Sequence, residues 1–311
     1  MGTGCVSTFE RVKLRPSFVV LGGYLDGSAN KFILIFDLEK CTLKRAIKLP
    51  NKDSTPLVDF AVSCTDEGHL YVTGGRYGRY GALSEVWMVD IRTNSDIAGQ
   101  PFQMMQSAQM NIIQRKHSSC YLQTDGYDYL YIVGGKRSHS HFLGCSRFNI
   151  FQLKWESLPA FPNDYPTENV KYVYSFNSNL YVVFETSLKE ASVLKYKAED
   201  GVSGDWIELQ WTIPLGRMQK VKETWYILST PSKTNTKLFA FYPSISPQQV
   251  SKLYSLPNCC AIASFQDEYL FLLAENKLYR YDIMQDDLLL YGNLPFIFEG
   301  DDVNFFITDT Y

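Results

Sequence analysis

Basic and aromatic side chains gather in two short segments of the sequence, and side chains of these types together bind acidic groups. The first segment contributes Arg76, Tyr77, Arg79 and Tyr80. The second segment contributes Lys136, Arg137, His139, His141 and Phe142. Arginine among aromatic residues is typical of protein interface hot spots, and a positive patch steers an acidic partner toward it. We therefore predict that both segments bind a partner protein that carries an acidic segment.

A metal site is a second chemistry to consider, because His139 and His141 stand two residues apart. Zinc and copper need three or four ligands, and the other two histidines, His69 and His117, fall in predicted strands. A polar loop explains the histidine pair without a metal. We expect no metal and no cofactor.

The sequence lacks the motifs of common enzymes. It contains no nucleophile elbow, Walker loop or dinucleotide fingerprint, and no pair of carboxylates stands out beyond the turns. The glycine-rich run at 74–78 follows an apolar strand, so a turn accounts for its glycines. We therefore expect a protein that is not an enzyme and that has no catalytic residues.

The first residues offer a candidate for lipid attachment. Gly2 followed by Cys5 is similar to an N-myristoylation site with a second acylated cysteine, but Val6 stands where such sites have serine or threonine. A single myristoyl chain anchors weakly, so Cys5 would have to carry a second chain. We keep Gly2 and Cys5 as candidates beside the alternative of an unmodified N-terminus.

Both basic segments follow glycine pairs, and these pairs belong to a repeat. Short apolar runs end in Gly22-Gly23, Gly74-Gly75 and Gly134-Gly135. The next strand of each unit ends in a large apolar or aromatic residue followed by a polar or aromatic one, at Phe36-Asp37, Val89-Asp90, Phe148-Asn149, Tyr196-Lys197, Phe241-Tyr242 and Tyr281-Asp282. Leu-Pro pairs close several of these units, at Leu49-Pro50, Leu158-Pro159, Leu256-Pro257 and Leu294-Pro295. Six units of this kind cover nearly all 311 residues.

The order of these marks resembles the kelch repeat. The third unit shows it best, where residues 115–118, the glycine pair, Phe148-Asn149, Trp155 and Leu158-Pro159 follow one another. The resemblance weakens in units four to six, which lack the glycine pairs. It implies an all-β fold, a six-bladed β-propeller of kelch type that fills residues 1–311 as a single domain. We expect a stand-alone propeller without a BTB or F-box adaptor.

The expected blades follow the repeat. Blade one takes 15–50 together with 301–311, and the others take 57–105, 112–160, 168–212, 215–257 and 258–296. The segment 303–309 has the pattern of a first strand although no further blade follows it. We predict that it lies innermost in blade one, beside residues 17–23, and thereby closes the ring. The segment 5–14 is the alternative closing strand, but it lacks the turn that follows such strands.

The register of the repeat predicts two faces of opposite charge. Loops after the second strands carry the basic segments named above, and the turns after the first strands carry acidic residues, namely Asp66, Glu67, Asp125, Asp128, Glu223, Asp267 and Glu268. In kelch propellers that bind acidic peptides, arginines after the glycine pair and at the start of the first strand face the ligand. The resemblance assigns these places to Arg76, Lys136 and Arg115.

Net charge and composition limit the possible partners and compartments of the protein. The net charge of −3 argues against nucleic-acid binding, and no apolar run is long enough to span a membrane. Seven cysteines without CxxC pairs favour a reducing compartment, and we expect a cytoplasmic protein.

The function that we expect is that of a scaffold. Kelch propellers often act in cytoskeletal complexes, so the resemblance implies a protein that binds a partner through its loop face as a subunit of a large intracellular or cytoskeletal assembly. The alternative is an enzyme or small-ligand binder that uses the central channel, with or without a metal.

Overall fold

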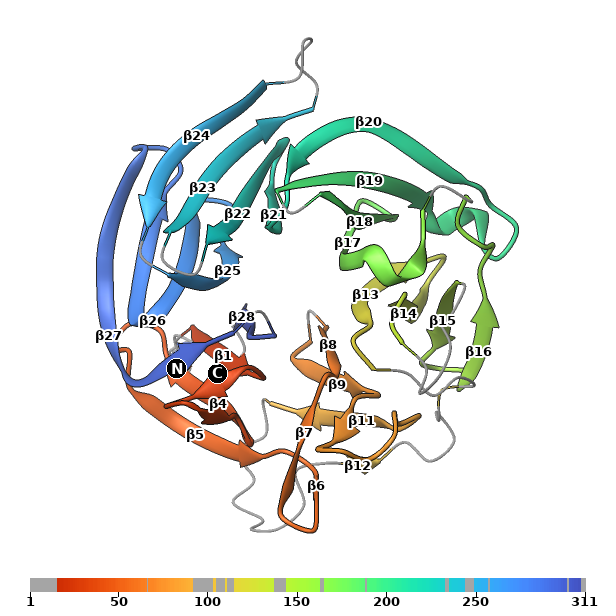
Figure 1. Cartoon of the computed structure of the whole chain (residues 1–311), viewed down its shortest axis with the longest axis horizontal. Coiled ribbons are helices and arrows are strands. Elements are labelled where there is room, and N and C mark those ends of the chain that lie inside the picture. The colour runs from red at the N-terminus through yellow and green to blue at the C-terminus, as the bar shows by residue number, and fades with distance from the viewer. Residues whose placement is uncertain are drawn as a thin grey trace, which may run out of the picture.

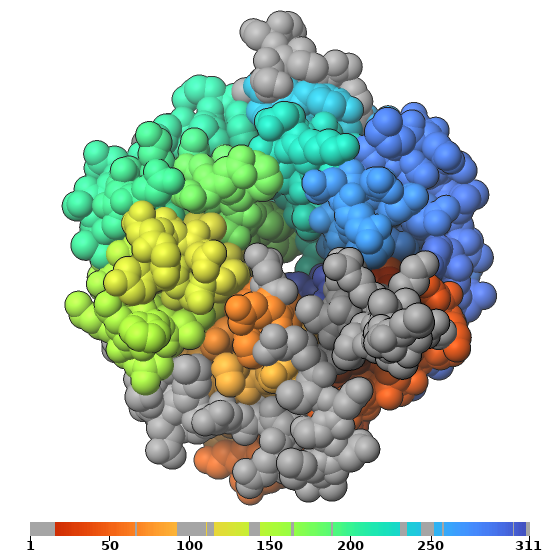
Figure 2. Space-filling model, turned by 180° about the vertical axis from the view of Figure 1, so that it is seen from behind, coloured from red at the N-terminus to blue at the C-terminus, as the bar shows by residue number. Residues whose placement is uncertain are grey.

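The computed structural model describes residues 16–65, 67–91, 103–104, 110, 115–136, 144–162, 165–187, 189–232, 235–243, 249–256, 258–300 and 302–308. These residues form small antiparallel sheets that stand around a central opening (Figure 1). The opening is also visible in the space-filling view from behind (Figure 2). No helix of the described residues is long and apolar enough to cross a membrane.

The first sheet joins the two ends of the described chain. Its order is β28 (Asn304–Thr308), β1 (Ser17–Leu21), β4 (Phe32–Asp37) and β5 (Leu43–Lys48). β28 runs antiparallel to β1 with Ser17 opposite Thr308 and Leu21 opposite Asn304. The pairing predicted between the C-terminal segment and the first strand is therefore present, with β28 as the strand nearest the central opening (Figure 1).

Four further sheets each use four strands that follow one another in the chain. The second sheet contains β8 (Ala61–Cys64), β9 (His69–Thr73), β11 (Val86–Asp90) and β12 (Gln103–Met104). The third contains β13 (Ser118–Thr124), β14 (Tyr127–Val133), β15 (Cys145–Asn149) and β16 (Lys154–Ser157). The fourth contains β17 (Val170–Phe176), β18 (Asn179–Ser187), β19 (Glu190–Lys197) and β20 (Trp206–Pro214). The fifth contains β21 (Arg217–Val221), β22 (Thr224–Ser232), β23 (Asn235–Tyr242) and β24 (Gln249–Leu256).

Two short pairings depart from this plan. The sixth sheet contains β25 (Cys259–Phe265), β26 (Tyr269–Asp282) and β27 (Asp287–Glu299), and it gains β2 (Tyr24–Leu25) and β3 (Ser28–Ala29) from the loop of the first sheet. A small side sheet pairs β10 (Arg76–Tyr77) with β7 (Thr55–Val58) and β6 (Asn51–Lys52). β6 and β7 belong to the linker between the first and second sheets. Two short 3₁₀ turns, η2 (Thr167–Asn169) and η3 (Ala198–Asp200), complete the described elements.

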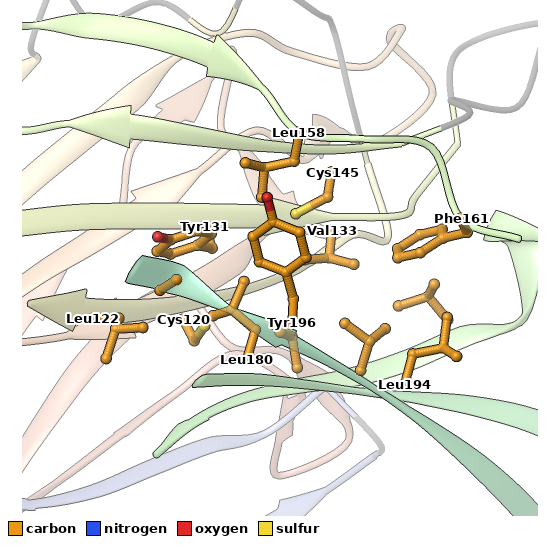
Figure 3. Packing of buried hydrophobic residues seen from close by; sticks show 14 of the residues in the cluster. Cys120, Leu122, Tyr131, Val133, Cys145, Leu158, Phe161, Leu180, Leu194 and Tyr196 are labelled. Carbon is orange, nitrogen blue, oxygen red and sulfur yellow. The ribbon is translucent and has the colours of Figure 1, made fainter. Parts of the chain in front are cut away.

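The core lies between neighbouring sheets rather than within one layer. Val19 and Leu21 of β1 pack toward the second sheet, whereas Phe18 and Val20 pack toward the sixth. A strand covered on both faces reads as a continuous apolar run, which is why residues 18–21 do not alternate. Between the third and fourth sheets, side chains of β13, β14 and β15 meet those of β18 and β19, with Tyr131 and Tyr196 among them (Figure 3).

The first three sheets have a glycine pair at the end of the second strand, and the last three sheets have none. Gly22, Gly74 and Gly134 have φ values of 76°, 56° and 66°, a conformation that side chains disfavour, and the strands before them end after five to seven residues. In the fourth and fifth sheets the corresponding second strands run for nine residues, and in the sixth sheet the fourteen-residue β26 contains both the 274–275 position and Tyr281-Asp282. Each of them contains a register shift where the glycines are missing, beginning at Glu185, Ser229 and Glu275. The strand pairing therefore changes register at the positions where the first three sheets have a glycine pair.

Candidate partner-binding site

The innermost strands enclose a channel with a polar wall. A cavity of about 370 Å³ lies among residues of β8, β13, β17, β21 and β28. Many of its hydroxyl groups join one sheet to the next. The Ser63 and Ser119 Oγ atoms lie 2.8 Å apart, and Ser175 Oγ donates to the Tyr121 carbonyl at 2.7 Å. The polar wall therefore serves first to connect the sheets around the channel.

A second cavity of about 500 Å³ forms a mouth at one end of this channel. It lies where the chain leads into each innermost strand and where the loops leave the second strands. Charged residues of both signs line it, namely Asp59, Lys116, Lys136, Glu168, Lys171, Glu185, Arg217 and Asp302. We call the side of the molecule that carries this mouth the loop face.

Backbone contacts fix the mouth residues of the second and third sheets. Asp59 and Lys116 stand two residues before β8 and β13 and have φ values of 58° and 55°. The Lys116 N–H donates to the Asp59 carbonyl at 2.8 Å, so the segments that lead into these two strands are joined directly. Arg115 and Lys136 exchange backbone hydrogen bonds of 3.1 and 2.8 Å. The structure thus brings together Arg115 and Lys136, two of the residues that the sequence assigned to ligand binding.

Arg76 lies at the edge of the mouth but is engaged by its neighbours. Its Nε atom lies 2.5 Å from Asp59 Oδ2, and another guanidinium nitrogen donates to the Gly78 carbonyl. The Asp59 side chain is only 9% exposed, which makes this a partly buried ion pair that orders the loop. Arg76 therefore shapes the mouth and partly neutralises it.

The other aromatic and basic residues of the first segment lie apart from the mouth. Tyr77 is half-buried in β10 and packs on the core beside the second sheet, and burial raises the pKa of its hydroxyl. Arg79 and Tyr80 are exposed beyond β10. The Lys52 ammonium group lies 4.9 Å from the centre of the Tyr80 ring, which places Tyr80 at the end of the side sheet. The structure therefore divides the predicted site into a mouth group and a side-sheet group.

The sequence did not predict three of the four cations that line the mouth. Lys171 lies 2.7 Å from Glu185, the guanidinium of Arg217 lies 5.8 Å from the centre of the Tyr172 ring, and Lys116 is exposed. Lys171 is the second residue of β17, Arg217 is the first residue of β21, and Lys116 lies just before β13. All three lie at or just before the start of an innermost strand, and this shared position is the sequence feature that could have identified them. The sequence analysis used this feature for Arg115 alone.

The histidines of the described residues have structural partners. His117 is buried beside the channel, its Nε2 atom lies 2.9 Å from Thr73 Oγ1, and burial lowers its pKa from the ordinary value of 6.5 to about 4. His69 lies 3.8 Å from Glu67 and 3.9 Å from Asp90. Within the described ranges, no group of three or more His, Cys, Asp or Glu residues is placed to hold a metal ion. Arg137, His139, His141, Phe142, Gly2 and Cys5 lie outside the described residues.

Cys41, Cys120, Cys145 and Cys259 are buried free thiols. Burial raises the pKa of Cys120, Cys145 and Cys259, so these side chains are uncharged and poorly nucleophilic. Cys259 packs in the core beside the fifth sheet, whereas Cys260 packs toward the first sheet. The two neighbouring residues therefore point to opposite sides of β25, as strand geometry predicts.

The side of the molecule opposite the mouth is strongly acidic. We call it the turn face, because it carries the turns between first and second strands and between third and fourth strands. The described residues of these turns include two lysines, Lys40 and Lys222, against ten acidic residues, which are Glu39, Glu67, Asp125, Glu199, Asp200, Asp205, Glu223, Asp267, Glu268 and Asp286. Of the acidic residues named from the sequence, Asp128 lies within β14 and Asp66 lies outside the described residues.

The loop face is less basic than the sequence predicts. The charged residues that line its mouth comprise four of each sign, so their charges balance. Asp59 and Glu185 are engaged by Arg76 and Lys171, as described above. The exposed cations of the mouth are Lys116, Lys136 and Lys171, and Lys171 is paired with Glu185, so the basic character of this face depends on Lys116 and Lys136.

Comparison with known families finds a kelch match. Residues 60–95 match the family model of the Kelch motif, and no curated protein matches the chain. The matched residues contain β8, β9 and β11, the Gly74-Gly75 pair and the basic segment at 76–80. This match and the many small antiparallel sheets fit a kelch-repeat β-propeller.

Proposed function

We propose that the protein is a six-bladed kelch-type propeller that acts as a non-enzymatic scaffold for protein binding. Six sheets of four or more strands support the blade count, and the pairing of β28 with β1 supports closure of the ring within the first blade. A closed ring leaves no innermost strand without a neighbour, which removes a common site of aggregation. Kelch domains generally bind proteins, which agrees with this role.

The mouth on the loop face carries the proposal. Its cavity is formed by strand starts and loops of several sheets, so a partner that sits there contacts many parts of the ring at once. Because the neighbouring carboxylates of Asp59 and Glu185 are engaged, Lys116 and Lys136 present their charge at the rim. We propose that these two lysines and Arg115 receive an acidic segment of the partner. The free thiols agree with a role in a reducing compartment, as one subunit of an intracellular or cytoskeletal assembly.

Charge reversal at the rim tests this function. In the double variant Lys116→Glu and Lys136→Glu, capture of the main partner from cell extract should fall about tenfold, because like charges would then oppose the acidic segment. Quantitative mass spectrometry of captured proteins measures the loss, and cross-linking locates the contact.

The matched control is Lys40→Glu with Lys222→Glu, which changes the same charge on the turn face. Unchanged capture by the rim variant, or an equal loss in the control, would show that the loop face is not the binding site.

The channel cavity favours a second candidate function, the binding of a small polar ligand. Its wall presents Tyr172, Tyr174 and Gln219 around about 370 Å³. A stoichiometric metal in the purified protein that disappears in His139→Ala with His141→Ala would support this candidate in its metal-dependent form. We expect metal analysis to find no such metal.

A further inference from the structure

Four apolar side chains are exposed on the turn face of the third and fourth sheets. Phe151 is 83% exposed and Leu153 is 40% exposed, both in the turn between β15 and β16. Val202 is 46% exposed in the turn between β19 and β20, and Tyr127 is 40% exposed at the start of β14. We call these four residues the apolar turn patch. Contiguous exposed apolar groups mark interaction sites more often than single ones do.

Contacts beneath the patch connect its members. The Ile150 N–H donates to the Asp128 carbonyl at 2.9 Å, which joins the Phe151 turn to the strand start that bears Tyr127. The rings of Tyr127 and Tyr129 lie 6.5 Å apart, and the Arg147 guanidinium lies 4.3 Å from the centre of the Tyr129 ring. Gly201, which precedes Val202, lies beside the same guanidinium. These contacts connect the turns and strand ends of the third and fourth sheets that carry the four side chains.

Hydrogen bonds hold both turns in place. Asn149 Oδ1 accepts from the Gln152 N–H at 2.8 Å, and Tyr196 donates from its hydroxyl to the Gly201 carbonyl at 2.8 Å. The Trp206 indole N–H donates to the Pro159 carbonyl at 2.9 Å, which ties the fourth sheet to the third. Phe151 and Val202 thus project from ordered turns. A preorganised surface loses little entropy when it binds.

The charge around the patch identifies its occupant. Asp125, Glu199, Asp200 and Asp205 are exposed in the same turns, and the nearby Lys154 lies 3.7 Å from Glu156. An acidic rim repels nucleic acid and anionic membranes and attracts lysine and arginine. We propose that the apolar turn patch binds a protein segment in which lysine or arginine side chains flank apolar ones. The protein would then hold two partners, one at each end of the channel axis.

Selection from a random peptide library displayed on phage, with the whole protein as bait, tests this site. The enriched peptides should combine basic and apolar residues. Their affinity should fall at least about tenfold in the variant Phe151→Ser with Val202→Ser, since loss of an apolar anchor removes most of the binding energy of such a contact. The variant Glu199→Lys with Asp205→Lys should weaken the same peptides through charge alone.

Two controls establish whether a loss of affinity is specific to the patch. Met284→Ser removes an apolar side chain that is 78% exposed in the turn between β26 and β27, and it should leave affinity unchanged. Lys116→Glu with Lys136→Glu should also leave it unchanged, so this test and that of the loop face can fail separately. Thermal unfolding confirms that each variant is folded.

Several outcomes would overturn the proposal. These are enrichment of acidic peptides or of none, equal affinity for the wild type and the Phe151→Ser, Val202→Ser variant, and loss of affinity in the loop-face variant. Self-association of the wild type that the patch variant abolishes would assign the surface to a second copy of the chain instead.

Discussion

Gly22 and Gly27 have the same backbone conformation but different surroundings. Both have a φ of 76°. A Cβ atom on Gly22 would stand 2.4 Å from the Asp302 carbonyl oxygen, whereas a Cβ atom on Gly27 would meet nothing within 4 Å. The pair separates the two reasons for which a glycine is required, the left-handed backbone and the close approach of another segment.

Alanine substitutions should therefore differ in cost. Gly27→Ala should lower the free energy of unfolding by about 1 kcal/mol, the strain of a left-handed residue. Gly22→Ala should cost about 1–3 kcal/mol more, because the segment before β28 must move. Urea unfolding measures both values, and equal costs would show that the approach of Asp302 does not constrain Gly22.

The buried His117 predicts a dependence of stability on pH. Its pKa of about 4 in the folded protein lies below the ordinary 6.5, so the unfolded chain takes up the proton first as the pH falls. Stability from this group is complete above about pH 6.5 and is lost as the pH falls toward 4. The loss should reach about 2 kcal/mol at about pH 5. Chemical unfolding at several pH values should show a shallower decline for His117→Gln than for the wild type.

His69→Gln is the matched control for this measurement, because it removes a histidine from β9 that is not fully buried. A His117→Gln variant whose stability declines as steeply as that of the wild type would contradict the assignment.

Residues of the site could be predicted only where a local sequence pattern marks their position. Lys136 lines the mouth and is paired with Arg115, and a glycine pair and a strand start mark these two positions in the sequence. Lys171 and Arg217 belong to the same mouth, but two other sheets supply them and no local motif marks them. The ion pair of Arg76 with Asp59 could not be predicted from the sequence either, because it joins a loop to the linker that precedes the sheet.

Among the elements, the long strands were predictable and the two-residue pairings were not. Glycine pairs, apolar runs and turn residues mark strands such as β1, β9 and β14. No sequence periodicity marks the side sheet of β6, β7 and β10, because its strands are too short. The same holds for the addition of β2 and β3 to the sixth sheet. The repeat weakens in its second half, where β18, β22 and β26 have register shifts in place of the glycine pairs, but the sheets persist there.

Removal of β28 should destabilise the whole protein. Val303 and Phe305 are 0% and 6% exposed and belong to the core between the first and sixth sheets. Deletion of residues 301–311 removes these side chains and exposes the edge of β1, so the free energy of unfolding should fall by about 3–6 kcal/mol. Thermal unfolding measures the change, and a synthetic peptide of residues 301–311 should restore part of it.

Deletion of residues 309–311 is the matched control, because it leaves β28 complete. A protein without residues 301–311 that melts at the wild-type temperature would rule out a stabilising role for this strand.

At the scale of the whole molecule, the repeat register predicted an acidic side, and the described turns carry that charge. The predicted basic side is balanced at its mouth, because Asp59, Glu168, Glu185 and Asp302 stand among its cations. These acidic residues lie in linkers and strand ends, which the sequence pattern did not assign to that face. The apolar turn patch was missed for a related reason. A single exposed Phe151 or Val202 is ordinary in a turn, and the sequence pattern does not show that both turns lie on one face of neighbouring sheets.

The pairing of Ser17 with Thr308 also determines how the protein responds to force. The ends of β1 and β28 lie opposite each other at the turn face, so tension on the two ends separates the strands from that side. The hydrogen bonds of this ladder then break one after another instead of sharing the load. A protein stabilised by large cores between its sheets therefore opens at low force when it is pulled by its termini.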